Sequence, residues 1–436
     1  MFLSRKRTIQ LILLLAMALI AAHFIFFNYK TKDKVMKTLV SQARVKCSFK
    51  KKTSLLNTNS INPTKNKAFS CGTWQQRYAQ FHRNALKSPE TARFLVYTCL
   101  DNNCGGLGNR IFGIASLLYL AVLTNRVFLI HWEGATKLID CLQPRKIEWD
   151  YPINLLKIGN KSKYHYWGSS RPNYSKKYTD IRVESAIKFK QWVSNTNFSA
   201  TLTLQYELIG TIRYFGDQVL NNKYLKLKAM NLDLPKKDSN FPFATLGCAY
   251  DFLFKPTKNL SSLIQKYRKR LMPGNRVSKP RKAICMHIRT SDFQFGVRNI
   301  RSIRTTQFKN FFSCAEKVEK YIYESNLLDL APNEEIKWFL ATDNVDVKNY
   351  AKMTYKEKLF TVDFKPEHLE YSKRKDTLRM ILVDMALLTE CEFFLATIHS
   401  SFSNVITGRK RHSIDTFVYG EECDGTRLAK KLSSIS

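Results

Sequence analysis

The sequence predicts an α/β protein with two Rossmann-like halves, each a parallel sheet covered by helices, and a ligand cleft between them. Two regions, 94–130 and 282–408, alternate short apolar runs of strand length with segments of helical apolar spacing. Loops rich in glycine or hydroxyl residues follow several of these runs. The chain has 436 residues, of which 44% are hydrophobic, so it can bury a large core and form two or three domains.

The first region predicts one strand–helix–strand unit. An apolar run at 94–98 predicts a buried strand, and a glycine-rich loop at 101–110 follows it. Helical spacing at 111–123 predicts a helix, and 126–130 predicts a second strand. The following segment, to about 275, is aromatic and basic without a clear period. Its aromatic side chains either pack a core or form a carbohydrate platform, and these are Tyr164, Tyr166, Trp167 and Tyr174.

The second region repeats the alternation of strands and helices. Strands are predicted at 282–288, 337–341, 358–362 and 392–396. Helices are predicted at 345–352, at 377–388 and from Ser400 onward, where Gly408 is expected to end the last one. This alternation predicts a doubly wound parallel sheet, whose ligand lies at the carboxyl ends of the strands.

The chain begins with an apolar segment that is long enough to span a membrane. About nineteen residues, 9–27, cover roughly 28 Å as a helix. No cleavage site with small residues follows, so we expect a retained signal-anchor behind a cytoplasmic tail at 1–8, with a cleaved signal peptide as the alternative. A polar stem is expected at 28–90, a first domain at 91–275 and a second domain at 276–436.

The charge and the cysteines restrict the class of partner. There are 71 Lys and Arg against 35 Asp and Glu, and the net charge of +36 favours nucleic acid, lipid headgroups, a phosphorylated ligand or an acidic glycan. Ten cysteines suit several disulfides in a lumenal domain, although Cys285 and Cys391 also suit buried thiols. A lumenal domain makes nucleic acid an improbable partner. Four glycosylation sequons agree with it, at Asn160, Asn173, Asn197 and Asn259.

Two loops at predicted strand ends carry candidate chemistry. The loop GGLGNR at 105–110 lets a ligand approach the backbone and leads into a helix start with free N–H groups, a tight turn being the alternative. In the loop HIRTSD at 287–292, His287 and Arg289 point to the same side, and the Arg289 guanidinium suits phosphate oxygens. Asp292 either orients Arg289 or accepts a proton, and an ordinary ion pair is the alternative.

A third loop, TIHSSFS at 397–403, lies between a predicted strand and a predicted helix. Its hydroxyls and backbone amides suit a phosphate, the alternative being a simple helix cap. Asp384 on the preceding helix either accepts hydrogen bonds from a base or ribose or faces solvent.

Four motifs stand in an order that is found in a known family. They are GGLGNR at 105–110, HIRTSD at 287–292, FLATDNVDV at 339–347 and ILVDMALLTECEFFLATIHSSFSNVITG at 381–408. Together they resemble the GDP-fucose-dependent fucosyltransferases, the superfamily that joins α-1,2-, α-1,6- and protein O-fucosyltransferases. Residues 115–130 are also similar to plant xyloglucan fucosyltransferases. The expected anchor, stem and sequons are similar to those of a Golgi type II glycosyltransferase.

The resemblance implies a GT-B fold, with an acceptor-side first domain and a second domain that binds the nucleotide sugar. It implies metal-independent transfer of L-fucose from GDP-fucose to a glycan with inversion, through an α-1,2 or α-1,6 type of linkage, by a single-pass protein of the Golgi membrane. No cofactor and no nucleic acid are expected as partners, and a homodimer is compatible. Arg289 and Asp292 are the implied catalytic residues. The implied donor-binding residues are Gly106, Gly108, Asn109, Arg110, His287, Arg289, Asp384, Ser400 and Ser401.

The sequence departs from the family pattern in its second motif. Many members carry two adjacent arginines there, whereas Thr290 follows Arg289 in this chain. The acidic residue that core α-1,6 enzymes use as a base has no counterpart at 293–297, which leaves Asp292 as the candidate. Two alternatives therefore stay open: a catalytically inactive relative that binds glycans or partners, and a transferase for another nucleotide sugar.

Overall fold

The computed structural model describes residues 69–98, 105–156, 158–167, 186–239, 241–271, 283–290, 307–324, 335–370, 372–410 and 416–418. The chain divides into two compact units, Met1–Asn66 and Lys67–Ser436, and all described residues belong to the second. Within these ranges no helix has both the length and the apolar character needed to cross a membrane. The predicted anchor at 9–27, Asn173, Tyr174 and Asp292 lie outside the described residues.

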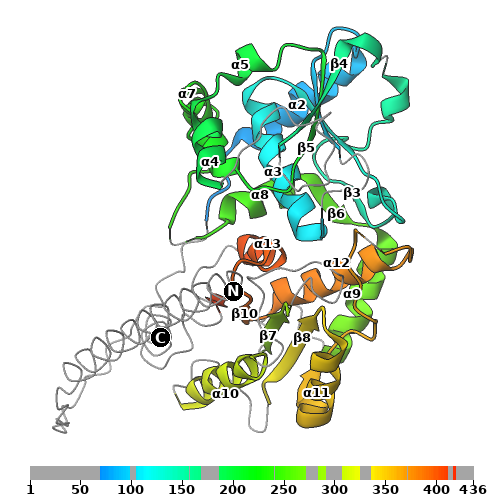
Figure 1. Ribbon diagram of the computed structural model, residues 1–436, viewed down its shortest axis with the longest axis vertical. Helices are drawn as coiled ribbons and strands as arrows, with labels where there is room; N and C mark the ends of the chain where they lie inside the picture. Colours follow the sequence, from blue (N-terminus) through cyan, green and yellow to red (C-terminus); the bar gives the residue numbers. More distant parts are fainter. Residues whose placement is uncertain are drawn as a thin grey trace, which may run out of the picture. The chain divides into compact units, whose positions relative to one another are not determined.

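The first half contains a four-stranded parallel sheet in the order β2-β1-β5-β4 (Figure 1). Its strands are β1 (Phe94–Thr98), β2 (Val127–His131), β4 (Ser162–Tyr166) and β5 (Tyr206–Gly210). Helix α3 (Leu107–Leu123) connects β1 to β2, which confirms the predicted strand–helix–strand unit. All five residues of β1 are buried, because both faces of the sheet are covered.

Further elements surround this sheet. A short antiparallel pair joins β3 (Leu142–Pro144) to β6 (Phe254–Pro256). The helices are α2 (Trp74–Lys87), α4 (Ala186–Asn195), α5 (Phe198–Thr201), α6 (Gly216–Leu220), α7 (Lys226–Asn231) and α8 (Ala244–Leu253). Helix α9 (Lys258–Leu271) follows β6 and packs against α12 (Thr377–Glu390) of the second half (Figure 1). The aromatic residues of this region include a packed cluster rather than a platform. Trp167 is 1% exposed, and its ring lies 5.2 Å from that of Trp192 and 5.8 Å from that of Phe198.

The second half contains a five-stranded parallel sheet in the order β11-β10-β7-β8-β9. Its strands are β7 (Ala283–Ile288), β8 (Lys337–Thr342), β9 (Leu359–Phe360), β10 (Phe393–Ala396) and β11 (Thr416–Val418). Its helices are α10 (Lys309–Glu324), α11 (Val345–Tyr355), α12 (Thr377–Glu390) and α13 (Ser401–Lys410). Strands and helices alternate as the sequence predicts.

Helices cover both faces of this sheet. Alternate residues of the central strand β7 point to opposite sides, so Ile284 and Met286 join one cluster with α10 and α11. Cys285 joins the other cluster, with the apolar side chains of α12. Figure 1 shows α10 and α11 apart from α12 across the strands. The sheet is therefore doubly wound, and the cluster on its α12 face continues into the core of the first half.

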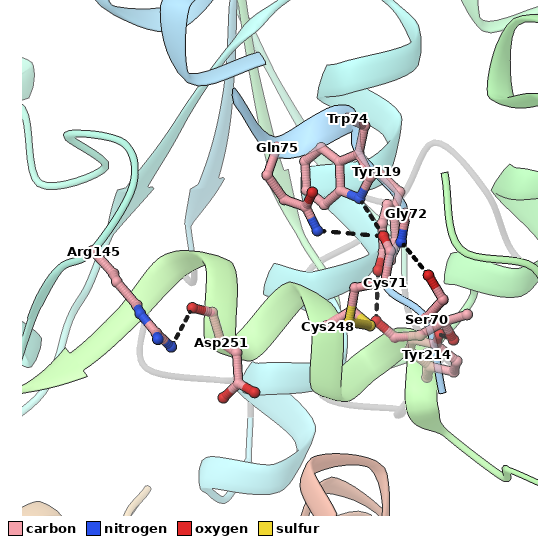
Figure 2. Close-up of a disulfide and its surroundings, with 11 residues drawn as sticks. Ser70, Cys71, Gly72, Trp74, Gln75, Tyr119, Arg145, Tyr214, Cys248 and Asp251 are labelled. Atoms are coloured by element: carbon pink, nitrogen blue, oxygen red, sulfur yellow. Dashed lines mark hydrogen bonds between the residues drawn. A yellow bond between two sulfur atoms is a disulfide. The ribbon is translucent and has the colours of Figure 1, made fainter. Parts of the chain in front are cut away.

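The folded chain begins before residue 91, which corrects the expected extent of the stem. Helix α2 buries Trp74 and Tyr78, and the Trp74 ring lies 4.6 Å from that of Phe252. A disulfide between Cys71 and Cys248 fastens the start of this segment to α8 (Figure 2). The carbonyl of Cys71 also accepts the indole N–H of Trp74 at 2.9 Å. Because its buried residues are spread among polar ones, α2 resembles a polar stem in sequence.

Helix α13 does not end at Gly408 as predicted but continues to Lys410. A Cβ atom on Gly408 would lie 2.2 Å from the carbonyl oxygen of Phe243, and one on Gly247 would lie 1.9 Å from the carbonyl oxygen of Gly408. Glycine is therefore needed here because α13 and α8 pack with their backbones in close approach, which is a different role from ending a helix.

Most of the described cysteines are paired, and the described sequon asparagines lie at the surface. Cys285 pairs with Cys391 rather than remaining a thiol, and Cys314 is also disulfide-bonded. Among the described cysteines, Cys141 is free and fully buried. Three sequon asparagines fall within the described ranges, and each is exposed: Asn160, Asn197 and Asn259.

Candidate functional site

The carboxyl ends of three neighbouring strands form the candidate site. β10, β7 and β8 run parallel side by side, so the residues that follow them meet at one edge of the sheet. These residues are Thr397, Arg289 and Asp343. The backbone N–H of Arg289 donates to Thr397 Oγ1 at 3.0 Å, and Arg289 Nη1 lies 3.4 Å from Asp343 Oδ2. The predicted Arg289 therefore stands at the centre of this edge.

Thr290 holds the partner of Arg289 in place. The backbone N–H of Thr290 donates to Asp343 Oδ1 at 2.9 Å, and Thr290 is 1% exposed. Its hydroxyl also accepts a hydrogen bond from Asn344 Nδ2 at 3.1 Å. The residue that replaces the second arginine of the family pattern thus faces inward and fixes Asp343. Arg289 has a side chain that is 28% exposed, so part of its guanidinium reaches solvent.

His287 is buried behind Arg289 and supports the third loop. Its Nδ1 lies 2.8 Å from Ser403 Oγ, and its ring lies 4.9 Å from that of Phe402. Ser403 Oγ also accepts the backbone N–H of Thr397 at 3.2 Å. Burial and the nearby charge of Arg289 lower the pKa of His287 to about 3, so the imidazole is neutral near pH 7. His287 consequently positions the start of α13 rather than supplying a charge.

The first turn of α13 lies directly after this loop. Ser400 Oγ accepts the backbone N–H of Ser403, and the Ser400 carbonyl accepts that of Asn404 at 3.0 Å. His399 has a positive φ of 60°, a conformation that non-glycine residues adopt mainly where surrounding contacts enforce it. The turn thereby places Ser400 and Ser401 at the helix start, where the N–H groups of the first turn have no acceptor within the helix itself.

The starts of α3 and α13 meet at Gly108. A Cβ atom there would lie 2.4 Å from the backbone nitrogen of Phe402 and 2.7 Å from Ser401 Oγ. Neither helix has an acidic residue in its first turn. The positive ends of two helix dipoles therefore meet, and no carboxylate in the first turn of either helix neutralises them. The binding of an anion is favoured at such a position. This contact brings the predicted glycine loop of the first half to the predicted serines of the second.

The glycine loop itself is shaped by Gly105 and Asn109. Gly105 has a positive φ of 67°, and a Cβ atom on it would lie 2.6 Å from the Asn109 amide nitrogen. Gly106 is the extended residue that precedes α3, and the Nε2 of His368 would lie 3.5 Å from a Cβ atom at this position. Gly106 and Asn109 are both half-buried, so each keeps part of its surface accessible.

Arg110 lies inside the protein, which differs from its predicted direct contact with the donor. It is 1% exposed, its Nε donates to the Gly105 carbonyl at 3.1 Å, and its Nη1 donates to the Glu133 carbonyl at 2.8 Å. Its guanidinium also stacks 4.7 Å from the centre of the Trp132 ring. Burial lowers the pKa of Arg110. The side chain therefore fixes the shape of the glycine loop from behind.

Asp384 lies on α12 beside Lys348 of α11. Its Oδ1 is buried without a hydrogen-bond partner among the described residues. Burial raises the pKa of Asp384, and the charge of Lys348 opposes this rise. Lys348 Nζ donates to the carbonyls of Val362 and Phe364, the latter at 2.6 Å. An unpaired carboxylate oxygen in a buried setting suits an N–H donor of a ligand.

Three residues that form part of the candidate site are not among those that the sequence predicts to bind the donor. Asp343 follows β8 directly, so the strand-end rule that selects Arg289 also applies to it. Thr397 likewise follows β10, and its Oγ1 donates to the His287 carbonyl at 2.5 Å. His368 carries no such signal, because its loop follows the two-residue strand β9 and runs without regular structure to α12. Within the described ranges, no group of three or more His, Cys, Asp or Glu side chains is arranged to hold a metal ion.

No protein-family profile matches the sequence, and no curated protein matches it. Solved structures do match its fold. A mutant of FUT1 from Arabidopsis thaliana in complex with GDP has a TM-score of 0.50 and 16% sequence identity, covering 80% of this chain and 79% of that chain.

Two further solved structures match with lower TM-scores. The fucosyltransferase NodZ from Bradyrhizobium has a TM-score of 0.41 at 14% identity, over 72% of this chain and 92% of its own. POFUT1 in complex with GDP has a TM-score of 0.41 at 11% identity, over 76% of this chain and 99% of its own. From the FUT1 match, we conclude that the chain shares the fold of that protein.

Proposed function

We propose that the protein transfers L-fucose from GDP-fucose to a glycan acceptor with inversion at the anomeric carbon. The observation that carries the proposal is the convergence of Arg289 with the starts of α3 and α13 at one sheet edge. This arrangement suits a diphosphate, because a guanidinium and free helix N–H groups neutralise phosphate oxygens. The match to the GDP-bound FUT1 structure supports GDP as the nucleotide.

In the proposed reaction, the protein acts mainly on the leaving group. An acceptor hydroxyl oxygen forms a bond to fucose C1 while the bond between C1 and the diphosphate oxygen breaks, and GDP departs with the electron pair. Arg289 stabilises the charge that develops on the diphosphate, together with the N–H groups near Ser400 and Ser401. Asp343 holds Arg289 in orientation throughout. Asp292 stays the predicted acceptor of the hydroxyl proton.

The proposed recognition of the nucleoside uses Asp384. Its buried Oδ1 lacks a partner among the described residues, so an N–H donor of the base would satisfy it. Gly106, Gly108 and Asn109 approach the donor from the other half, while Arg110 supports their loop from inside. We further propose that the reaction needs no divalent cation, since Arg289 and the two helix starts supply the positive field that a cation provides elsewhere.

We also propose a location in the Golgi membrane with the folded unit on the lumenal side. The disulfides Cys71–Cys248 and Cys285–Cys391 support an oxidising compartment. The exposed sequon asparagines Asn160, Asn197 and Asn259 support the same compartment. The apolar residues 9–27 are the proposed anchor.

The test is a turnover assay on the purified full-length chain in detergent. GDP release from GDP-fucose is measured with and without an array of glycan acceptors, with and without EDTA, and with GDP-mannose as the control donor. We expect GDP release that depends on an acceptor and on GDP-fucose and that EDTA does not change. Binding of GDP without turnover on any acceptor would identify an inactive relative, and turnover with another donor alone would contradict the fucose assignment.

A further inference from the structure

A groove of about 730 Å³ is lined by residues other than Arg289 and the strand-end residues that hold it. Its walls come from both halves of the folded unit: residues 135–143, the start of α9, and the start of α12 with the residue Lys375 before it. The volume falls within the range of pockets that hold small molecules or short oligosaccharides. Nothing in the proposed reaction at the sheet edge uses these residues.

The charge of the groove is strongly unbalanced. Four cationic side chains line it, Lys137, Lys258, Lys375 and Arg379, against the single carboxylate of Asp140. The three lysines are exposed, and none of them forms a salt bridge among the described residues. Lys137 acts at longer range on Asp150, whose pKa it lowers against the effect of burial.

One carboxylate beside the groove is already engaged by another arginine. Asp376, one residue after Lys375, accepts hydrogen bonds from Arg374 Nε at 3.1 Å and from Arg374 Nη2 at 2.9 Å. The lining of the groove therefore carries more positive than negative charge. Such a surface attracts a ligand that carries more than one negative charge.

The walls of the groove are fixed in position. Thr136 Oγ1 donates to the carbonyl of Lys375 at 2.6 Å and ties the first half to the segment before α12. This hydrogen bond holds the backbone of one wall in place before a ligand binds, so that part of the site is preorganised.

We propose that this groove binds an acidic oligosaccharide. Its carboxylate or sulfate groups contact Lys137, Lys258 and Lys375, while the exposed side-chain amide of Gln143 forms hydrogen bonds with sugar hydroxyls. The disulfides of the folded unit favour a compartment without nucleic acid, which selects a saccharide as the polyanion. That the bound saccharide is the fucose acceptor rests on the proposed function, whereas the binding itself does not.

The experiment measures binding by calorimetry on the full-length chain without any donor. The probes are a sulfated heparin-derived hexasaccharide, a carboxylated hexagalacturonate and neutral maltohexaose. The groove variant is Lys137→Glu with Lys375→Glu, and the matched control is Lys190→Glu with Lys226→Glu, which changes the net charge equally at exposed lysines of α4 and α7. Should charge reversal lower the melting temperature, the variant Lys137→Gln with Lys375→Gln replaces it.

We expect one or both acidic hexasaccharides to bind and maltohexaose not to bind. The Glu groove variant should lose at least about tenfold in affinity and the Gln variant about threefold, against less than about twofold for the control. Equal losses in groove and control variants, or no binding of either acidic probe, would overturn the inference. GDP release from GDP-fucose is measured in parallel. If an acidic hexasaccharide binds the groove but no transfer occurs, the result contradicts the proposed function and leaves the proposed groove binding intact.

Discussion

The two halves of the folded unit both place an arginine beside a loop that the sequence predicts to bind the donor, but the two side chains have different surroundings. Arg110 in the first half is 1% exposed and donates to the backbone carbonyls of Gly105 and Glu133. Arg289 in the second half has a side chain that is 28% exposed and pairs with Asp343 at the end of β8. The same residue type therefore shapes a loop from inside the protein in one half and keeps part of its charge accessible to solvent in the other.

The difference follows from where each arginine lies in its element. Arg110 falls in the first turn of α3, a helix that is buried along nearly its whole length, so its side chain has to find partners inside the protein. Arg289 falls just after the central strand of its sheet, where parallel strands leave their carboxyl ends open to a ligand. Burial and exposure thus separate a structural from a functional guanidinium, and substitutions should separate them too.

The largest expected effect is on turnover in Arg289→Ala. The variant removes the charge that stabilises the departing diphosphate, so kcat for transfer should fall by about 10²- to 10³-fold. The melting temperature should change little, because the side chain is partly exposed. Arg270→Ala is the matched control, since Arg270 is an exposed arginine paired with Asp363. Turnover near that of the wild type would contradict the role given to Arg289.

Arg110→Ala should show the opposite signature. Two backbone carbonyls lose their donors and the Trp132 ring loses its stacked cation, so the free energy of unfolding should fall by about 3 kcal/mol. Thermal and urea unfolding measure this loss, while transfer activity is compared per folded molecule. A strong fall in kcat with unchanged stability would mean that Arg110 contacts the donor directly, and the contrast between the two arginines would fail.

Gly108→Ala should disturb the junction between the halves. The added Cβ meets the backbone nitrogen of Phe402 at 2.4 Å, so α3 and α13 have to move apart, at a cost of about 1–3 kcal/mol in stability. The affinity for GDP should fall as the two helix starts separate. Gly106→Ala is the control for stability, because its Cβ meets only His368 at an ordinary 3.5 Å. An equal loss of stability in the two variants would show that the close approach at Gly108 does not hold α3 and α13 together.

The contrast also explains how much the sequence could predict. Strand-end logic predicts that Arg289, Ser400 and Ser401 follow strands at one edge of the sheet, and the fold has them there, whereas their binding of a donor stays a prediction. The same logic cannot tell that Arg110 turns inward, because its burial depends on Trp132 and Glu133, which lie beyond the next strand. Exposure of a charged side chain is a property of the packed structure rather than of its motif.

Two further misreadings have related causes. Gly408 is a helix breaker by local preference, but contact with α8 across the core keeps it inside α13. Helix α2 looks polar in sequence, yet a few aromatic side chains and the Cys71–Cys248 disulfide are enough to hold it on the fold. In both cases a long-range contact overrides the local signal.

The smallest expected effect concerns pH and uses one histidine from each half. Burial lowers the pKa of His82 on α2 to about 4 and that of His287 to about 3, below the value of about 6.5 in the unfolded chain. The unfolded state therefore binds more protons below pH 6.5, and each histidine should reduce the free energy of unfolding by about 1.4 kcal/mol per unit as pH falls toward its folded pKa.

Substituting each histidine separates its effect on stability from its effect on the site. His82→Gln and His287→Gln should both flatten the fall in stability between pH 6.5 and 5.5 by about 1 kcal/mol, which urea unfolding at each pH measures. Only His287→Gln should also lower transfer, because His287 contacts Ser403 at the start of α13, whereas His82 bonds the Phe128 carbonyl in the first half. A slope that neither substitution changes would show that other groups set the acid sensitivity. Loss of transfer activity in His82→Gln would show that residues of the first half outside α3 also affect the site.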